Sequence, residues 1–450
     1  MVRHQAISKG GLRPLLKWTR FIIYLLLLFL LYHTFVSFNV SSSSSSQSPD
    51  THTITNRTHL DNQSPSSFTP LYRDFPWYKE PHPRVTMIGN ASTTHLTTTE
   101  RINLQQSLVD QAKLQAKLAF QKVPFHQPGG IPGSSLKTST TVNDLRAKID
   151  CWTKGQWIPS TSDQLIHHVQ DPLYATCDKR FYKTHSPLEF RPETQYQWQP
   201  LGDKSMCSQT VLPRATPSQW CQVLNGRHIL LVGDLVQYQL HEIFLDSLRD
   251  GPTVCFGELN CKDHTICSEA DTRLRYLRND ILADNRRHNN NDGAPSGSVI
   301  TWPFVASNIL KAYPILILNR SPVVEDDETF ITSLIQTMTT IRRMTPDALI
   351  IYRSSAIGHP YCDDASAPLT KPLTDDEKKR LPFGWAELDR RNAIARTIVE
   401  EAGGVYVDLA ALVESRPDGH VGGRDCLRYC IPGPLDAWMD ILYQVFAALG

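Results

Sequence analysis

The chain lacks an excess of charge of either sign. It holds 46 Lys and Arg residues against 45 Asp and Glu residues, a formal net charge of +1. Proteins that bind the phosphate backbone of nucleic acids normally carry a strongly basic patch or stripe. We therefore predict no nucleic-acid partner. The 450 residues suffice to bury the core of one large domain or of two ordinary ones.

Metal-binding strings are also missing. There is no His-Glu-x-x-His string, which on one helix face would hold zinc, and no Cys-x-x-Cys cluster of the structural zinc type. His167-His168 has no ligand partner at a suitable spacing. We predict no metal and no cofactor. The absence of an Asp-x-Asp string, which would hold the metal of a nucleotide sugar, counts against a glycosyltransferase without excluding that class.

One long hydrophobic run is present, and it indicates the compartment. Residues 21–38 read FIIYLLLLFLLYHTFVSF, carry no formal charge and follow a basic tail at residues 1–20. Such a run can span a thin bilayer, and the basic residues before it favour a cytosolic amino terminus. We expect a transmembrane signal anchor, single-pass type II topology and a lumenal carboxyl-terminal domain. A cleaved signal peptide is the alternative, although no clear cleavage site follows the run.

The region after the anchor changes in composition. Residues 39–146 are rich in Ser, Thr and Pro, which predicts a stem, and Asn56 and Asn90 head glycosylation sequons in it. All ten cysteines lie beyond the anchor, in a compartment that permits disulfides. We expect a disulfide-bonded domain whose connectivity the spacing leaves open.

Within the stem, one helix is predicted. Thr97 and Glu100 form a capping-box pattern that opens a helix through about Lys122, with Leu114 and Leu118 among its apolar positions. The heptad pattern is not sustained, so a short packing helix is expected rather than a coiled coil.

Residues 147–450 are expected to form the folded domain. Buried strands are predicted at 228–232, 315–318, 348–352 and 405–409. Helical patterns lie at 236–248, 329–344 and 385–402. This alternation predicts a parallel sheet covered by helices on both faces. Active sites in such sheets gather at the carboxyl ends of the strands, where Gly233-Asp234-Leu235, Asn319 and Arg353 follow the predicted strands.

Several ordered motifs carry a family resemblance. They are Cys151-x-x-x-Gly155-x-Trp157, Asn225-Gly226-Arg227-His228 leading to Gly233-Asp234, Arg416-x-Asp418-x-His420, and Asp425-Cys426-x-x-Tyr429-Cys430-x-Pro432-Gly433-x-x-Asp436-x-Trp438. In this order they resemble the plant trichome birefringence-like proteins and their fungal relatives, the PC-esterase group of the SGNH hydrolase superfamily. The resemblance covers the folded domain and implies an SGNH-like (flavodoxin-like) α/β fold.

The resemblance also implies acyl-transfer chemistry, in which the Ser of Gly-Asp-Ser takes an acetyl group and the His and Asp of Asp-x-x-His activate it. Such a reaction needs an attacking hydroxyl, a neutral imidazole to take its proton and a carboxylate to orient that imidazole. Here Leu235 stands in place of the Ser and Arg428 in place of the His. A hydrocarbon cannot attack, and a guanidinium cannot accept a proton.

Other residues are candidates for a replacement chemistry. His420 with Asp425 can form a base and its orienting carboxylate, and Asp234 can attack as a carboxylate. The family has a His at the position of His420 beside its catalytic one, which favours a structural or binding role, and Asp234 can instead fix the turn after its strand. Asn319 is a candidate oxyanion donor, although the Gly and His of the family's Asn-x-Gly-His block are absent.

Arg353 and His359 resemble the family's Arg-x-x-Ser-Pro-x-His segment. They are candidates to line the cleft, and scaffolding of the loop is an equal alternative.

Two functions are compatible with these residues. The first is a catalytically degenerate protein of the Golgi or endoplasmic reticulum membrane that binds a polysaccharide or supports an acyltransferase partner protein. The second is an active polysaccharide O-acetyltransferase or esterase with a non-standard site.

Overall fold

The computed structural model describes residues 92–123, 129–160, 176–186, 188–248, 263–284, 299–323, 325–423 and 425–450. These residues belong to one compact unit, Thr69–Gly450. The expected anchor at 21–38 and the sequons at Asn56 and Asn90 lie outside the described residues. In the part of the chain that is described, no helix is both long and apolar enough to cross a membrane.

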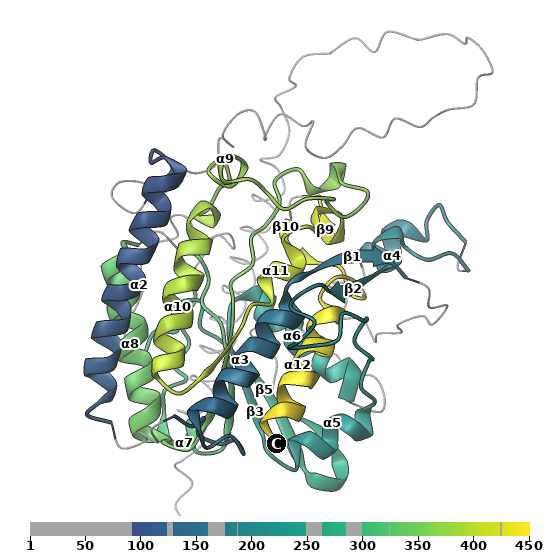
Figure 1. Cartoon of the computed structure of the whole chain (residues 1–450). Helices are drawn as coiled ribbons and strands as arrows, with labels where there is room; N and C mark the ends of the chain where they lie inside the picture. Colours follow the sequence, from purple (N-terminus) through teal and green to yellow (C-terminus); the bar gives the residue numbers. More distant parts are fainter. Residues whose placement is uncertain are drawn as a thin grey trace, which may run out of the picture. The chain divides into compact units, whose positions relative to one another are not determined.

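A six-stranded sheet of order β4-β5-β3-β6-β7-β8 forms the centre of the unit (Figure 1). Its strands are β3 (Ile229–Gly233), β4 (His264–Cys267), β5 (Thr272–Arg278), β6 (Ile315–Leu318), β7 (Leu349–Arg353) and β8 (Val405–Val407). Only β4, on one edge, runs antiparallel to its neighbour. Numbered along the chain, the parallel strands β5-β3-β6-β7-β8 have the order 2-1-3-4-5, which is flavodoxin-like. The predicted parallel sheet is confirmed.

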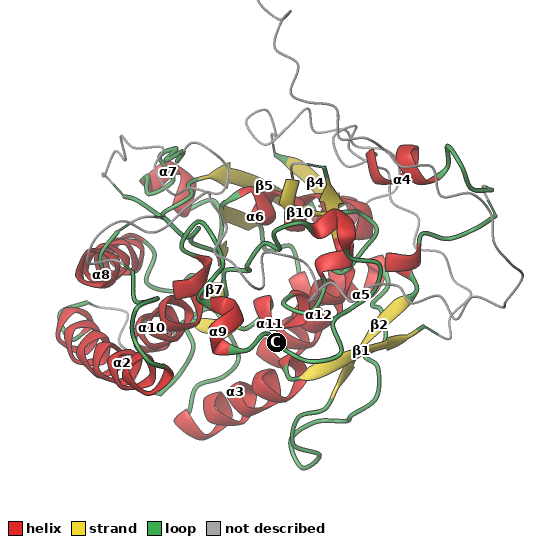
Figure 2. Ribbon diagram, turned by 90° about the horizontal axis from the view of Figure 1, so that it is seen from above, coloured by secondary structure: helices red, strands yellow, loops and turns green. Residues whose placement is uncertain are grey.

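Helices cover both faces of this sheet, as the sequence predicts (Figures 1 and 2). The helices are α2 (Thr98–Phe120), α3 (Ser139–Thr153), α4 (Thr176–Phe181), α5 (Pro217–Leu224), α6 (Leu235–Leu248), α7 (Ser307–Leu310), α8 (Asp327–Met344), α9 (Asp375–Lys378), α10 (Leu388–Glu401), α11 (Ala410–Val413) and α12 (Asp436–Leu449). Short 3-10 turns lie at Pro192–Thr194, Ser268–Ala270, Cys362–Asp364, Trp385–Glu387 and Pro417–Gly419.

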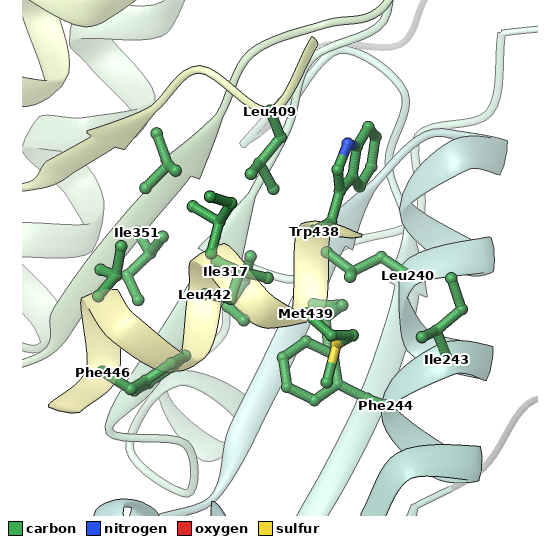
Figure 3. Packing of buried hydrophobic residues seen from close by; sticks show 14 of the residues in the cluster. Leu240, Ile243, Phe244, Ile317, Ile351, Leu409, Trp438, Met439, Leu442 and Phe446 are labelled. Carbon is green, nitrogen blue, oxygen red and sulfur yellow. The ribbon is translucent and has the colours of Figure 1, made fainter. Parts of the chain in front are cut away.

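The core is divided by the sheet because successive side chains of a strand point to opposite faces. Ile229 and Leu231 of β3 belong to the apolar cluster that includes residues of α3, α5, α6 and α12. Leu230 and Val232 belong to the cluster on the other face, with residues of α2, α8 and α10. Figure 3 shows the first cluster, in which Phe244 of α6 lies close to α12.

The amino-terminal boundary of the fold differs from the predicted one. The capping box of Thr97 and Glu100 is present at the start of α2, but this helix packs on α8 and α10 instead of standing in a stem (Figure 2). Its buried residues are Ala112, Ala116 and Phe120, whereas Ile102, Leu114 and Leu118 are exposed. Leu108, another of the predicted apolar positions, packs against the core cluster, so the predicted packing helix is present but its apolar positions are divided between the buried and the exposed side.

Two small antiparallel sheets and four disulfides complete the described fold. Strand β1 (Gly155–Pro159) pairs with β2 (Tyr196–Pro200), and β9 (His420–Gly422) pairs with β10 (Asp425–Tyr429). The disulfides are Cys151–Cys207, Cys177–Cys430, Cys221–Cys267 and Cys362–Cys426. The expected disulfide-bonded domain is confirmed for these eight cysteines, while Cys255 and Cys261 lie outside the described residues.

Candidate functional site

The candidate site lies where the strand order reverses, between β3 and β6. Ligands of doubly wound sheets bind in the crevice outside the carboxyl ends of the strands at this point. Asn319, directly after β6, donates its main-chain N–H to the Val232 carbonyl at 3.0 Å. A Cβ added to Gly233 would lie 3.1 Å from the Asn319 Cβ. The glycine therefore permits the close approach of these two strand ends.

Asp234 holds the turn between β3 and α6. Its Oδ1 accepts a hydrogen bond from the Gln237 main-chain N–H at 3.0 Å, which satisfies one of the free donors at the start of α6. The same oxygen accepts from Arg353 Nη2 at 2.9 Å. Tyr276 donates its hydroxyl to the carbonyls of Gly233 and Asp234 at 3.1 and 2.8 Å. This turn is therefore fixed by four hydrogen bonds, and the predicted convergence of Asp234 with Arg353 is present.

Arg353 is fully buried beneath the turn. Besides Asp234, it donates from Nε to Gln237 Oε1 at 2.5 Å and from Nη1 to the Ser354 carbonyl at 3.0 Å. Its guanidinium also lies 5.1 Å from the Trp438 ring centroid. Burial lowers the pKa of Arg353, and the charge of Asp234 acts in the opposite direction. The pair is a buried ion pair supported by hydrogen bonds on both sides.

Asn319 is fully buried and is held by Ser355. Its amide donates to Ser355 Oγ at 3.0 Å, and Ser355 in turn donates to the Arg320 carbonyl. The Asn319 Oδ1 is buried without a hydrogen-bond partner. The Asn319 amide has two N–H donors, and Ser355 occupies one of them, so this donor is not available to an oxyanion.

Leu235 and Arg428, which the resemblance places at the nucleophile and base positions, lie on α6 and β10. Leu235 is the first residue of α6 and is 9% exposed. Arg428 pairs with Asp425, with 2.5 Å between Nε and Oδ2, and its main-chain N–H donates to Asp425 Oδ1 at 3.1 Å. Gln239 of α6 and Tyr429 of β10 exchange two hydrogen bonds of 2.9 and 2.5 Å. These bonds join the helix that carries Leu235 to the strand that carries Arg428.

His420 and His359 contact each other. His420 Nε2 lies 2.7 Å from His359 Nδ1, His359 Nε2 lies 2.8 Å from the Glu414 carbonyl, and His420 Nδ1 lies 3.2 Å from the Arg428 carbonyl. A carbonyl only accepts, so the Glu414 contact places a proton on His359 Nε2 and the Arg428 contact places one on His420 Nδ1, an assignment inferred from partners. The contact between the two rings would need a third proton, so two neutral rings satisfy the two carbonyls and leave the ring-to-ring contact without a donor.

Burial also weakens both histidines as bases. It lowers the pKa of His359 to about 4. Burial lowers the pKa of His420 well below its usual value, and the nearby His359 acts in the same direction. A neutral imidazole whose nitrogens are both engaged has no lone pair directed at a substrate hydroxyl. The structure thus pairs His420 with His359, and Asp425 with Arg428.

A separate cavity of about 280 Å³ opens near the carboxyl ends of β7 and β8. Its lining residues include Ser355, Asn392, Tyr406, Asp408 and Glu414. Burial raises the pKa of the Asp408 carboxyl, and Asn392 exchanges hydrogen bonds with the Ser355 main chain at 2.9 and 3.0 Å. Through Ser355 this cavity adjoins Asn319.

Three residues of the site, Gln237, Gln239 and Tyr276, were not among those predicted from the sequence. Gln237 and Gln239 are fully buried in α6. Gln237 contacts Arg353 in the half of the site at the end of β3, and Gln239 contacts Tyr429 in the half formed by β10. The two glutamines stand in the largely apolar run LVQYQLH, and this was a usable signal. A polar side chain buried in such a run is normally hydrogen-bonded, which points to a specific partner elsewhere in the fold. Tyr276 had no such signal, since β5 itself was not predicted.

The described fold is a doubly wound α/β protein with a candidate site at its switch point. The chain is similar to plant proteins named xyloglucan O-acetyltransferases. Xyloglucan O-acetyltransferase 2 of Populus trichocarpa is 23% identical over 369 residues, which cover 65% of this chain and 81% of the relative. These relatives fit the trichome birefringence-like resemblance and support a polysaccharide O-acetyltransferase-like family.

Two further relatives match over shorter stretches. Xyloglucan O-acetyltransferase 2 of Arabidopsis thaliana is 28% identical over 92 residues, 15% of this chain. Xyloglucan O-acetyltransferase 4 of Populus trichocarpa is 32% identical over 98 residues, 18% of this chain. Each of these alignments spans only 22% of the relative's length. No family model matches the chain.

Proposed function

We propose that this protein is a catalytically degenerate relative of polysaccharide O-acetyltransferases, which binds a polysaccharide or supports an active acyltransferase. The ion pair between Arg428 and Asp425, at 2.5 Å, carries the proposal. In a serine triad, the carboxylate orients a neutral imidazole. Here the carboxylate that would do so faces a guanidinium that cannot take a proton. With Leu235 at the nucleophile position, neither the attacking atom nor the proton acceptor is supplied.

The remaining framework supports binding. The Asp234–Arg353 pair, the Gln239–Tyr429 link and the four disulfides keep the strand ends in place. Enzymes that lose triad residues retain the binding surface and lose most of the rate. A glycan site without turnover is therefore the simplest role for this arrangement.

The alternative is an active O-acetyltransferase or esterase with a non-standard site. Asp234 is its strongest candidate nucleophile, because a carboxylate can form an acyl intermediate and this one retains 8% exposure. Attack would require Asp234 to release Arg353 and the start of α6. His420 with Asp425 is a weaker candidate because each has another partner in the structure.

The membrane topology belongs to the same proposal. The run at 21–38 and its basic flank support a type II anchor in the Golgi or endoplasmic reticulum. Disulfides persist in oxidising compartments, and all eight described cysteines are bridged. Fusion of a glycosylation reporter to the carboxyl terminus tests the lumenal orientation, and a reporter that stays unmodified contradicts it.

The test of the function compares the wild-type chain with the double variant Leu235→Ser, Arg428→His. Acetyl transfer to xyloglucan oligosaccharides and hydrolysis of acetyl esters are measured alongside oligosaccharide binding. We expect binding without turnover in the wild type and measurable turnover only in the double variant. Wild-type turnover that disappears in Asp234→Asn or His420→Ala would establish the alternative.

A further inference from the structure

Two exposed aromatic side chains lie on either side of the candidate site. Trp302 and Tyr361 are each 45% exposed, although tryptophan side chains are on average highly buried. Trp302 is attached to the end of β5, and Tyr361 belongs to the loop after β7. Strands β3 and β6, which lead to Asp234 and Asn319, lie between β5 and β7 in the sheet.

Trp302 is held firmly to the strand ends. Its main-chain N–H donates to the Arg278 carbonyl at 3.0 Å, and its carbonyl accepts from Asn279 Nδ2 at 3.0 Å. Ile300, two residues earlier, exchanges two 2.8 Å hydrogen bonds with Asp280. Asn279 also donates its N–H to the Gly233 carbonyl at 3.1 Å. The indole is therefore presented from a backbone bonded directly to the Gly233-Asp234 turn.

Tyr361 is held to the other half of the site. The next residue, Cys362, forms a disulfide with Cys426, and His359 donates its main-chain N–H to the Cys426 carbonyl at 3.0 Å. Cys426 directly follows Asp425, so the segment that carries Tyr361 is tied to β10, the strand of the Asp425–Arg428 pair. Each half of the candidate site thus has one exposed, backbone-anchored aromatic ring.

The two ion pairs of the candidate site are each electrically balanced. Asp234 pairs with Arg353, and Asp425 pairs with Arg428 at 21% and 23% side-chain exposure. Balanced pairs offer hydrogen bonds to hydroxyl groups without a net charge that would attract a uronate or a phosphate. A ligand with apolar ring faces and hydroxyl edges matches this combination of flat aromatic rings and neutral polar groups.

We propose that Trp302 and Tyr361 are the two stacking platforms of a binding site for a neutral oligosaccharide that lies across the candidate site. This inference rests on the proposed function and adds the residues and the charge class of the ligand. Three strand spacings separate β5 from β7, roughly 14 Å at the usual spacing. A ligand that reaches from the end of one of these strands to the end of the other is longer than one sugar ring, so the proposed ligand is an oligosaccharide rather than a monosaccharide.

Calorimetry on the full-length chain tests the inference with Trp302→Ala, Tyr361→Ala and Trp302→Phe. Leu114→Ala is the control, because Leu114 is equally an exposed apolar residue, 61% exposed, but lies on α2. Truncating an aromatic contact at the centre of a binding site typically costs more than 1 kcal/mol, so we expect each alanine variant to bind xyloglucan oligosaccharides about tenfold more weakly. Trp302→Phe, which keeps a ring, should recover most of the affinity, and Leu114→Ala should bind as the wild type does.

The outcomes separate the inference from the function on which it rests. Wild-type binding that both alanine variants retain overturns the platforms and leaves the proposed function in place. A wild-type chain that binds no neutral oligosaccharide overturns the inference together with the glycan-binding form of the proposed function, and leaves support of an acyltransferase as the remaining role. Tighter binding of polygalacturonate oligosaccharides than of neutral ones overturns the charge class. Melting temperatures of the variants, compared with the wild type, identify any loss caused by unfolding.

Discussion

The two halves of the candidate site have ion pairs of opposite character. On the β3 side, Arg353 is fully buried and contacts Asp234 and Gln237. On the β10 side, Arg428 and Asp425 remain partly exposed, at 23% and 21% of their side chains. Removing one partner of a buried pair leaves an uncompensated charge, whereas an exposed pair contributes little. The fold therefore depends on the first half, while the second can change its chemistry without loss of the fold.

Arg353→Gln is the substitution expected to have the largest effect. The substitution removes the cation that pairs with Asp234 and the N–H group that donates to Gln237. We therefore expect the free energy of unfolding to fall by about 3 to 5 kcal/mol. Urea denaturation of the disulfide-intact chain measures this loss. A cost below about 1 kcal/mol would mean that the buried pair does not hold the turn.

The histidine pair should make stability depend on pH. Burial lowers the pKa of His359 to about 4 and that of His420 well below 6.5. Between these values and 6.5, the unfolded chain binds more protons than the folded chain. The contribution of the two histidines to the free energy of unfolding is therefore complete above pH 6.5 and is lost as the pH falls. Each depressed histidine contributes a slope of up to about 1.4 kcal/mol per pH unit.

The measurement is a difference between two stability curves. Buried acids act in the opposite direction, because burial raises the pKa of Asp280 to about 6, that of Asp440 to about 7, and those of Asp408 and Glu414. His359→Gln leaves these acids unchanged and removes one titrating ring from the pair. We expect the wild-type curve to fall more steeply than that of the variant between pH 6.5 and 4. Parallel curves would show that His359 titrates normally.

The sequence predicted the parts of the fold whose signal is local. Strands β3, β6, β7 and β8 are nearly uninterrupted apolar runs, as strands buried on both faces are. Strand β5 was missed because Arg273, Arg275 and Arg278 interrupt its pattern, although Arg278 is buried beside Asp280. On α2, two alanines are fully buried while Leu114 and Leu118 are exposed, so hydrophobicity alone did not identify the side of the helix that packs on its neighbours.

The site shows the same limit. Strand ends place Asp234, Asn319 and Arg353 on one edge of the sheet, and this follows from the alternation of strands and helices alone. Pairing of side chains depends on directions that residue spacing does not give. The sequence therefore suggested His420 with Asp425, whereas the hairpin of β9 and β10 directs Asp425 to Arg428 and His420 to His359.

Arg428→Gln is the matched counterpart of Arg353→Gln and should have the smallest effect on stability. Asp425 keeps its hydrogen bonds from the main-chain N–H groups of Leu427 and Arg428, at 3.3 and 3.1 Å, so the carboxylate is not left without partners. We expect a loss of less than about 1 kcal/mol, reduced further at high ionic strength. Urea denaturation at two salt concentrations tests this. A loss as large as that of Arg353→Gln would mean that both halves are structural, and that the fold itself requires Arg428.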